Sequence, residues 1–218
     1  MAVVGIVPAA GSGERLGGPG PKAFVVCGGK PLLDWSLEVL HRVCERVVVA
    51  VPPGHEDAPD RVTGAATRSG SVRAALEAAP EASVAVVHDA ARPLVTLDLV
   101  QACIAAVEDG WDGAVAAAPV SETVKEADGD GRVVRTLDRS LLWAIQTPQV
   151  FRADVLRGAL DVDDDRLAAA TDDASLVEEA GGSVRVVEAP PENIKVTQPV
   201  DLALAEALLR ERAQARAD

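Results

Sequence analysis

Short apolar runs alternate along the chain with segments whose apolar residues recur at helical spacing. Strands rich in valine or alanine are predicted over residues 3–7, 47–51, 84–87, 114–118 and 184–187. Helices are predicted over residues 31–43, 71–79, 97–107, 174–180 and 200–212. Apolar strands without polar alternation are typical of a parallel sheet that helices cover on both faces. The pattern therefore predicts a doubly wound α/β fold with a mostly parallel sheet, whose ligands bind at the carboxyl ends of the strands.

The segment 122–137 has a different pattern. Polar and apolar residues alternate on both sides of Asp128-Gly129-Asp130-Gly131, which is typical of a β-hairpin. The segment is too polar to be a core element, and a lone hairpin is only marginally stable, so we expect it to project and to pack on another surface. No long linker divides the rest of the chain. We therefore expect a single domain over residues 1–218, with residues 121–138 inserted as an arm.

Composition narrows the classes of function. The chain has 218 residues, 48% of them apolar, and a net charge of −13, so a broad nucleic-acid-binding surface is not expected. A small anion can still bind where positive groups gather in one cleft. No apolar run is long enough to cross a membrane, and no basic leader precedes the first strand, so we expect a soluble cytoplasmic protein. Cys27, Cys44 and Cys103 have neither CxxC nor zinc spacing, which favours unpaired thiols in a reducing compartment.

A glycine-rich loop follows the first predicted strand. It reads Ala9-Ala10-Gly11-Ser12-Gly13, and Arg15 and Lys22 come after it. Glycines let backbone N–H groups face phosphate oxygens. The dinucleotide-binding fingerprint is not met because Leu16 replaces its third glycine, and the Walker A motif is not met because Pro31 stands where it requires Ser or Thr. We expect a phosphate-binding loop of another kind, with Arg15 and Lys22 as its cations. The alternative is an ordinary turn with surface charges.

A second candidate site follows the predicted strand 84–87. His88 and Asp89 come directly after it, and Arg92 comes three residues later. A carboxylate at a strand's carboxyl end suggests a Mg²⁺ ligand, since Mg²⁺ takes one or two carboxylates and fills its other positions with water and phosphate oxygens. Arg92 would add a planar fork for an anion. An Asp–Arg pair that only closes a loop is the alternative, and His88 alone is interpreted as structural.

Weaker signals lie further along the chain. Thr123 and Lys125 fall in the hairpin, Arg139 follows it, and the segments 147–149 and 193–197 carry further polar groups. Each is weak alone, because a surface lysine or arginine is usually solvated. Residues 161–165 are predicted to be a solvated acidic loop. The sequence offers cations and a candidate Mg²⁺ carboxylate, but it contains no arrangement typical of a Ser–His–Asp or Cys–His nucleophile.

Taken in order, these motifs resemble a known family. The sequence AAGSGERL followed by PK, then TRSGSV, HDAARP, ETVK, LDRSLLWAIQTPQ, TDDAS and NIKVT, resembles 2-C-methyl-D-erythritol 4-phosphate cytidylyltransferases over residues 3–208. The resemblance implies a Rossmann-like nucleotidyltransferase fold. It implies that methylerythritol phosphate attacks the α-phosphate of CTP, with Mg²⁺ bound, and releases pyrophosphate. The product, CDP-methylerythritol, belongs to the non-mevalonate isoprenoid pathway.

The resemblance also assigns roles to residues. It places transition-state stabilisation on Arg15 and Lys22, and positioning of the methylerythritol phosphate on Thr123, Arg139 and Lys195, with Arg92 nearby. Because it implies a homodimer that exchanges its arms, Thr123 and Arg139 would serve the partner's site. Asp89 is assigned to the metal or the ribose. The residues assigned to substrate binding are Ala9, Ala10, Gly11, Gly13, Gly64, Ala65, Arg68, Ser71, Asp89, Ala90, Arg92, Thr123 and Thr147.

The sequence departs from the family at the expected base contacts and leaves alternatives open. Ala65 replaces a usual glycine, Ala66 a usual carboxylate, and Ala23 a usual glutamine. The nearest alternative is a cytidylyltransferase for another polyol phosphate, such as ribitol 5-phosphate, although Ala91 and the ETVK segment favour methylerythritol phosphate. A non-catalytic relative is a further alternative, but it would be expected to have lost Arg15 or Lys22.

Overall fold

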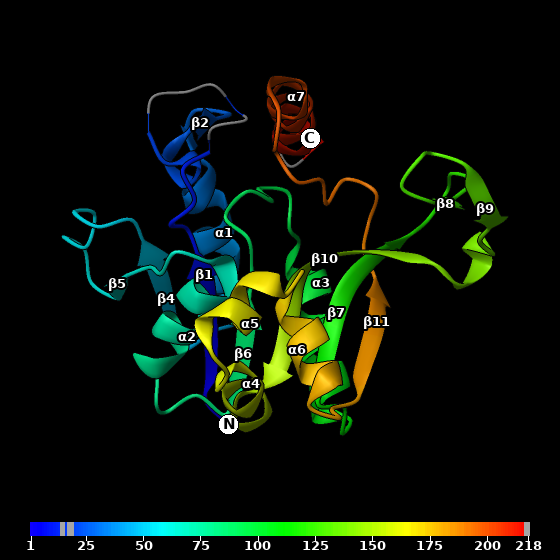
Figure 1. The fold of residues 1–218 in the computed structure, drawn as a ribbon. Helices are drawn as coiled ribbons and strands as arrows, with labels where there is room; N and C mark the ends of the chain where they lie inside the picture. The colour runs from blue at the N-terminus through cyan, green and yellow to red at the C-terminus, as the bar shows by residue number, and fades with distance from the viewer. Residues whose placement is uncertain (14–15, 17–19, 216–218) are drawn as a thin grey trace.

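A seven-stranded sheet forms the centre of the computed structural model, which describes residues 1–13, 16 and 20–215 (Figure 1). The strand order is β11-β7-β10-β6-β1-β4-β5. Every neighbouring pair is parallel except the two pairs that β10 makes with β6 and β7. The predicted mostly parallel sheet is therefore confirmed. Its strands are β1 (Val3–Pro8), β4 (Arg46–Val51), β5 (Arg61–Thr63), β6 (Val84–Val87), β7 (Gly113–Pro119), β10 (Trp143–Arg152) and β11 (Val184–Glu188).

Helices cover both faces of the sheet (Figure 1). One layer holds α1 (Leu32–Leu40) and α3 (Leu97–Glu108); the other holds α2 (Arg68–Glu77), α4 (Ala153–Leu160), α5 (Asp164–Ala169) and α6 (Asp173–Glu179). Val47 and Val49 of β4 belong to the first core layer, whereas Val48 and Ala50 belong to the second, because successive strand side chains point to opposite faces. Two covered faces explain why the strands lack polar alternation. Within the described residues, no helix has the length and apolar character needed to cross a membrane.

The last helix, α7 (Pro199–Ala215), packs outside these two layers. It contacts the small hairpin of β2 (Val26–Cys27) and β3 (Lys30–Pro31), which follows the short 3-10 helix η2 (Lys22–Phe24). Gly28 turns this hairpin at φ +58°, and an added Cβ would lie 3.2 Å from Leu209 Cδ1. The Gly28 N–H also donates to the carboxylate of Glu206 at 3.3 Å. The C-terminal helix thus braces the segment that carries Lys22.

The predicted hairpin arm is present. β8 (Lys125–Ala127) pairs antiparallel with β9 (Val133–Thr136), and every residue of both strands is exposed. The hairpin leaves the sheet between β7 and β10 and projects away from it (Figure 1). The Asp128 carboxylate closes the turn by accepting the N–H groups of Asp130 and Arg132.

The main correction to the sequence analysis concerns residues 143–169. The longest strand of the sheet, β10, was not predicted, because Pro148 and polar residues interrupt its apolar pattern. Its register with β7 shifts between Ile145 and Gln149, where a proline without an N–H is tolerated. The prediction of a loop over residues 161–165 is wrong for its last two residues, which form the first turn of α5. This helix begins at Asp164 because the Asp163 carboxylate caps it by accepting the Arg166 N–H at 2.8 Å.

Candidate active site

A pocket of about 580 Å³ opens at the carboxyl ends of β1 and β6. It is formed by the loop after β1, the residues around Lys22, the start of α2, the loop after β6 and the segment that precedes α7. The sequence analysis predicted this location from the parallel sheet. The predicted site residues that line the pocket are Ala9, Ala10, Gly11, Gly13, Lys22, Ala65, Arg68, Ser71, Asp89, Ala90 and Lys195.

The glycine-rich loop curls so that Lys22 lies directly against it. The Lys22 N–H donates to the Gly11 carbonyl at 3.3 Å. Gly13 has φ +74°, and a Cβ at this position would lie 2.6 Å from the Cβ of Lys22. A larger residue would therefore be strained and would push Lys22 away. Arg15, the other predicted cation of this loop, lies outside the described residues.

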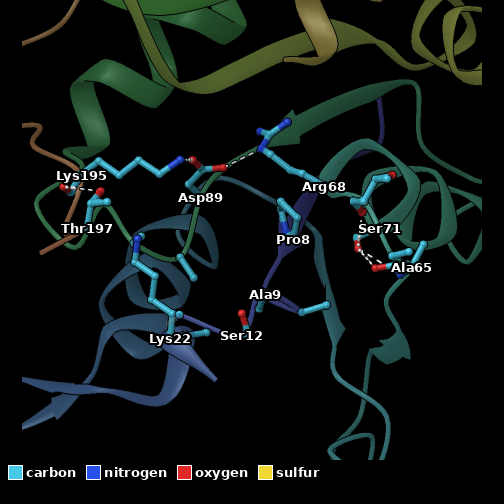
Figure 2. Close-up of a pocket in the computed structure, with 18 residues that line it drawn as sticks. Pro8, Ala9, Ser12, Lys22, Ala65, Arg68, Ser71, Asp89, Lys195 and Thr197 are labelled. Atoms are coloured by element: carbon cyan, nitrogen blue, oxygen red, sulfur yellow. Dashed lines mark hydrogen bonds and ion pairs between the residues drawn. The ribbon is translucent and has the colours of Figure 1, made fainter. Parts of the chain in front are cut away.

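Small neutral groups form the opposite end of the pocket. The Ser71 hydroxyl accepts the Ala65 N–H at 3.0 Å and donates to the Thr67 carbonyl at 2.9 Å. Gly64 lies beneath them, and a Cβ added to it would come within 2.4 Å of Ala10 Cβ. Figure 2 shows Ser71 and Ala65 on one side of the pocket and the lysines 22 and 195 on the other. The pocket thus has a neutral end and a cationic end.

Three charged side chains line one wall of the pocket, and a fourth, Asp173, lies buried behind them. The Arg68 guanidinium contacts Asp89 at 2.9 Å, and the Lys195 ammonium contacts Asp89 at 2.6 Å (Figure 2). Arg68 also contacts Asp173 at 2.5 Å. Burial opposes ionisation of Asp89, but Arg68 and Lys195 outweigh it and hold the pKa of that carboxyl well below its usual value. Burial likewise opposes the charge on Arg68, yet Asp173 and Asp89 raise its pKa. Asp89 is therefore a fixed anion between two cations.

A second cavity of about 430 Å³ adjoins the first. Arg68, Asp89 and Lys195 line both cavities, so these three side chains form the junction between them. Arg92 and Thr147 belong to the second cavity. The other lining residues are mostly polar and come from β10, from α6 and from the two residues before α6: Ile145, Gln146, Gln149, Thr171, Asp172, Ser175 and Glu178.

Both predicted residues of the second cavity are largely buried. Thr147 accepts the Asp89 N–H through its hydroxyl at 3.1 Å. Arg92 donates to the Asn193 carbonyl at 2.8 Å, and burial lowers the pKa of its guanidinium. Within the described part of the chain, the Nε of Arg92 has no hydrogen-bond partner. The cavity therefore presents a buried cation suited to an anionic ligand.

The two predicted arm residues lie outside both cavities. Thr123 and Arg139 are exposed, and the Arg139 guanidinium donates to the carbonyl of Ser121 near the base of the arm. Arg139 begins the 3-10 helix η3 (Arg139–Leu141). A single chain thus does not bring these two residues to the junction.

The donor set fits a metal ion that is held mainly by its substrate. In the portion of the chain that is described, no cluster of three or more His, Cys, Asp or Glu side chains could hold a metal ion. Asp89 is the one carboxylate among the described residues of the first pocket. Mg²⁺ binds through one or two carboxylates together with water and phosphate oxygens. Asp89 therefore fits as a single protein ligand to an ion that arrives with a polyphosphate.

Several residues of the site lie in segments that the sequence analysis named but were given no role in the site. Asp173 lies in the TDDAS segment, but its ion pair with Arg68 spans 105 positions, which no local pattern indicates. His88 and Asn193 are fully buried beside the junction. The available signal was that His88 directly precedes Asp89 and that Asn193 lies two residues before Lys195. Thr197 also lines the first pocket.

Comparison with known proteins agrees with this geometry. The model of the family IspD, 2-C-methyl-D-erythritol 4-phosphate cytidylyltransferase, matches residues 3–211. A protein of that name from Frankia casuarinae is 49% identical, and the match covers 95% of this chain and 81% of the relative. One from Nocardia farcinica is 44% identical over 97% of this chain and 95% of the relative. The crystal structure of the cytidylyltransferase from Thermus thermophilus has a TM-score of 0.82 at 38% identity, covering 96% of this chain and 100% of that chain. The chain therefore belongs to the 2-C-methyl-D-erythritol 4-phosphate cytidylyltransferase family, nucleotidyltransferases of isoprenoid biosynthesis.

Proposed function

We propose that CTP binds in the first pocket and 2-C-methyl-D-erythritol 4-phosphate in the second cavity. The neutral end at Ala65 and Ser71 suits an uncharged base, and the cationic end at Lys22 and Lys195 suits a triphosphate. The buried Arg92 suits the phosphate of the polyol substrate. The observation that carries this proposal is the junction, where Arg68, Asp89 and Lys195 line both cavities.

The junction defines the line of attack. The α-phosphate of CTP lies there, the polyol phosphate oxygen approaches from the second cavity, and pyrophosphate leaves into the first. The attacking phosphate is already an anion, so the reaction needs no general base. Catalysis consists of alignment and of stabilising the charge that grows on the transferred phosphoryl group. Lys22 and Lys195 supply positive charge on the pocket side, and Arg15 is proposed to add to it.

We propose a divalent ion, Mg²⁺, as the cofactor. When bound with CTP, it would neutralise charge on the triphosphate. Asp89 would hold it, because this carboxylate stays ionised between Arg68 and Lys195. Removing the Asp89 carboxylate would therefore raise the metal concentration that activity needs.

We further propose a cytoplasmic homodimer that shares its active sites through the arm. The arm and its base expose Val133, Val134, Leu141, Trp143 and Ile145, an apolar surface unusual for a free hairpin. A two-fold dimer would cover it and would bring Thr123 and Arg139 to the neighbouring junction. Arg139 would then bind the polyol phosphate by its planar fork. The buried, unpaired cysteines suit a reducing compartment.

The substrate assignment is tested by pyrophosphate release with each nucleoside triphosphate against each polyol phosphate. CTP with 2-C-methyl-D-erythritol 4-phosphate should be the preferred pair. Ribitol 5-phosphate with CTP should be turned over much more slowly. Preference for ribitol 5-phosphate, or for a nucleotide other than CTP, would contradict the assignment of the two cavities.

The shared site is tested by mixing two inactive variants, Lys22→Ala and Arg139→Ala. In a heterodimer of these subunits, one of the two sites keeps both residues, so activity should return after subunit exchange. Exchange is confirmed in the same sample by native mass spectrometry. No recovery after confirmed exchange, or sedimentation as a monomer at the assay concentration, would refute the shared site.

A further inference from the structure

A closed ring of hydrogen bonds lies buried beneath the junction. The Arg92 guanidinium donates to the Asn193 carbonyl at 2.8 Å, and the Asn193 amide donates to the Thr147 carbonyl at 3.0 Å. The Thr147 hydroxyl bonds to His88 Nδ1 at 3.1 Å, and His88 Nε2 bonds to the Arg92 carbonyl at 3.3 Å. The four residues come from three segments that are distant in sequence: the loop after β6, the strand β10 and the segment before α7. Each of the four is less than a tenth exposed.

The acceptors in the ring fix the position of one proton. The Arg92 carbonyl can only accept, so His88 Nε2 must carry the proton that is donated to it. The Thr147 hydroxyl already accepts the Asp89 N–H at 3.1 Å, so its own proton is available to His88 Nδ1. When the Thr147 hydroxyl donates to Nδ1, His88 is a neutral imidazole that is protonated on Nε2. A group of this kind orients its neighbours without carrying charge.

The ring is connected to two of the three charged side chains of the junction, Asp89 and Lys195. The Asp89 backbone is attached to it through the Thr147 hydroxyl. Lys195 lies two residues after Asn193, and the chain is held directly after Lys195 by the Val196 N–H, which donates to the Ala91 carbonyl at 2.8 Å. The spacing between Asp89 and Lys195, whose charged atoms lie 2.6 Å apart, thus depends on three segments that the ring joins.

We propose that His88 and Asn193 are positioning residues for the transfer reaction, which hold Asp89, Arg92 and Lys195 in place through this ring. The inference rests on the proposed function, because it concerns the same junction. Neither residue needs to touch a substrate. The hydrogen bonds of a buried polar network hold its members in place, and misplacement of reacting groups by about 1 Å costs up to about 100-fold in rate.

Substitutions at His88 separate the two halves of the ring. His88→Phe keeps similar bulk and removes both hydrogen bonds. In His88→Asn the shorter amide can still bond to Thr147, and in His88→Gln the longer amide can still bond to the Arg92 carbonyl. We expect His88→Phe to lower kcat by roughly 10- to 100-fold. The Asn variant should recover kcat through Asp89, whereas the Gln variant should recover the KM for the polyol phosphate through Arg92.

Asn193→Asp tests the other side of the ring with almost no change of shape. The carboxylate cannot donate to the Thr147 carbonyl or to the Gln146 side chain, which the amide reaches at 2.7 Å. The KM for the polyol phosphate should rise and kcat should fall. The KM for CTP should change less than the KM for the polyol phosphate, because Lys22 and the base end at Ala65 and Ser71 lie outside the ring.

A matched control separates positioning from general stability. Leu160→Ala removes a buried side chain of α4, in the same helix layer as α2. It should lower the free energy of unfolding about as much as His88→Phe does. Its kcat and both KM values should stay close to those of the wild type below its melting temperature. If His88→Phe keeps wild-type kinetics, or changes them only as much as Leu160→Ala does, the positioning role is wrong.

The tautomer gives a readout that does not depend on activity. The chain has three histidines, so ¹⁵N-edited NMR with His88→Gln for assignment can identify the ring nitrogens of His88. The protonated nitrogen should be Nε2, and in Thr147→Val the Nδ1 signal should shift because its donor is gone. A proton on Nδ1 would overturn the ring itself. If the wild type shows no cytidylyl transfer, the proposed function fails, while the NMR result still decides whether the ring exists.

Discussion

Removing Arg68 should destabilise the protein mainly through Asp173. The Asp173 side chain is fully buried, and its Oδ2 contacts Arg68 at 2.5 Å. Among the described residues, its Oδ1 has no hydrogen-bond partner. Asp89, the other partner of Arg68, would still keep Lys195. In Arg68→Met the Asp173 carboxylate is left buried without an ion-pair partner in the described part of the chain, a change that typically costs about 3–5 kcal/mol.

The partial exposure of Arg68 indicates that the loss of stability in Arg68→Met lies at the lower end of the range of about 3–5 kcal/mol. Because 29% of the Arg68 side chain is exposed, water screens part of its ion pair with Asp173. We therefore expect a loss of about 3 kcal/mol in the free energy of unfolding. For a domain of this size, each kcal/mol shifts the melting temperature by about 2–4 °C, so Arg68→Met should melt roughly 6–12 °C below the wild type.

A double variant tests the cause. Arg68→Met/Asp173→Asn removes the unpaired charge and should recover much of the stability that Arg68→Met loses, as measured by urea denaturation at pH 7.5. Leu160→Ala is the control for the loss of a buried side chain. A loss below about 1 kcal/mol in Arg68→Met, or a double variant no more stable than the single one, would refute the argument.

Three further predictions concern the active site. Lys22→Ala should lower kcat by roughly 10²–10³-fold with a smaller change in CTP affinity, because Lys22 stabilises negative charge that grows in the transition state. A near-normal kcat would show that Lys22 has no catalytic role. Asp89→Asn should shift the Mg²⁺ dependence of activity to higher concentrations, and an unchanged titration would leave Asp89 with a purely structural role. Burial lowers the pKa of His88 from 6.5 to about 4. The unfolded chain therefore binds more protons at this residue, and its contribution to stability is complete above pH 6.5 and lost as the pH falls towards 4. Without metal or nucleotide, the wild type should lose about 2 kcal/mol more than His88→Phe between pH 7.5 and pH 5; equal losses would contradict the buried neutral imidazole.

The sequence predicted those parts of the fold that local patterns determine. Unbroken runs such as residues 47–51 indicated strands covered on both faces, and the Asp–Gly repeat indicated the arm. The strand β10 was missed because its pairing with β6 and β7 is set by long-range contacts. Pro148 within it breaks the local strand signal.

In the site, too, local sequence patterns predicted some residues, whereas contacts between distant segments could not be predicted. Gly13, Lys22 and Asp89 were predicted because each follows a strand at the carboxyl edge of the sheet. The pairing of Arg68 with Asp173 could not be predicted, since a buried ion pair depends on how α2 and α6 pack in three dimensions. The roles of His88 and Asn193 were hidden for a similar reason. A buried polar residue shows its partners only after three separate segments have come together.

The most direct test of the whole account is a ³¹P NMR time course with the purified protein, CTP, 2-C-methyl-D-erythritol 4-phosphate and Mg²⁺. The account predicts that the phosphomonoester signal of the polyol disappears while a diphosphate diester and pyrophosphate appear in equal amounts. Lys22→Ala in the same buffer should show almost none of this conversion. Pyrophosphate without the diester, or an unchanged phosphomonoester signal with wild-type protein of confirmed fold, would contradict cytidylyl transfer at the junction of the two cavities.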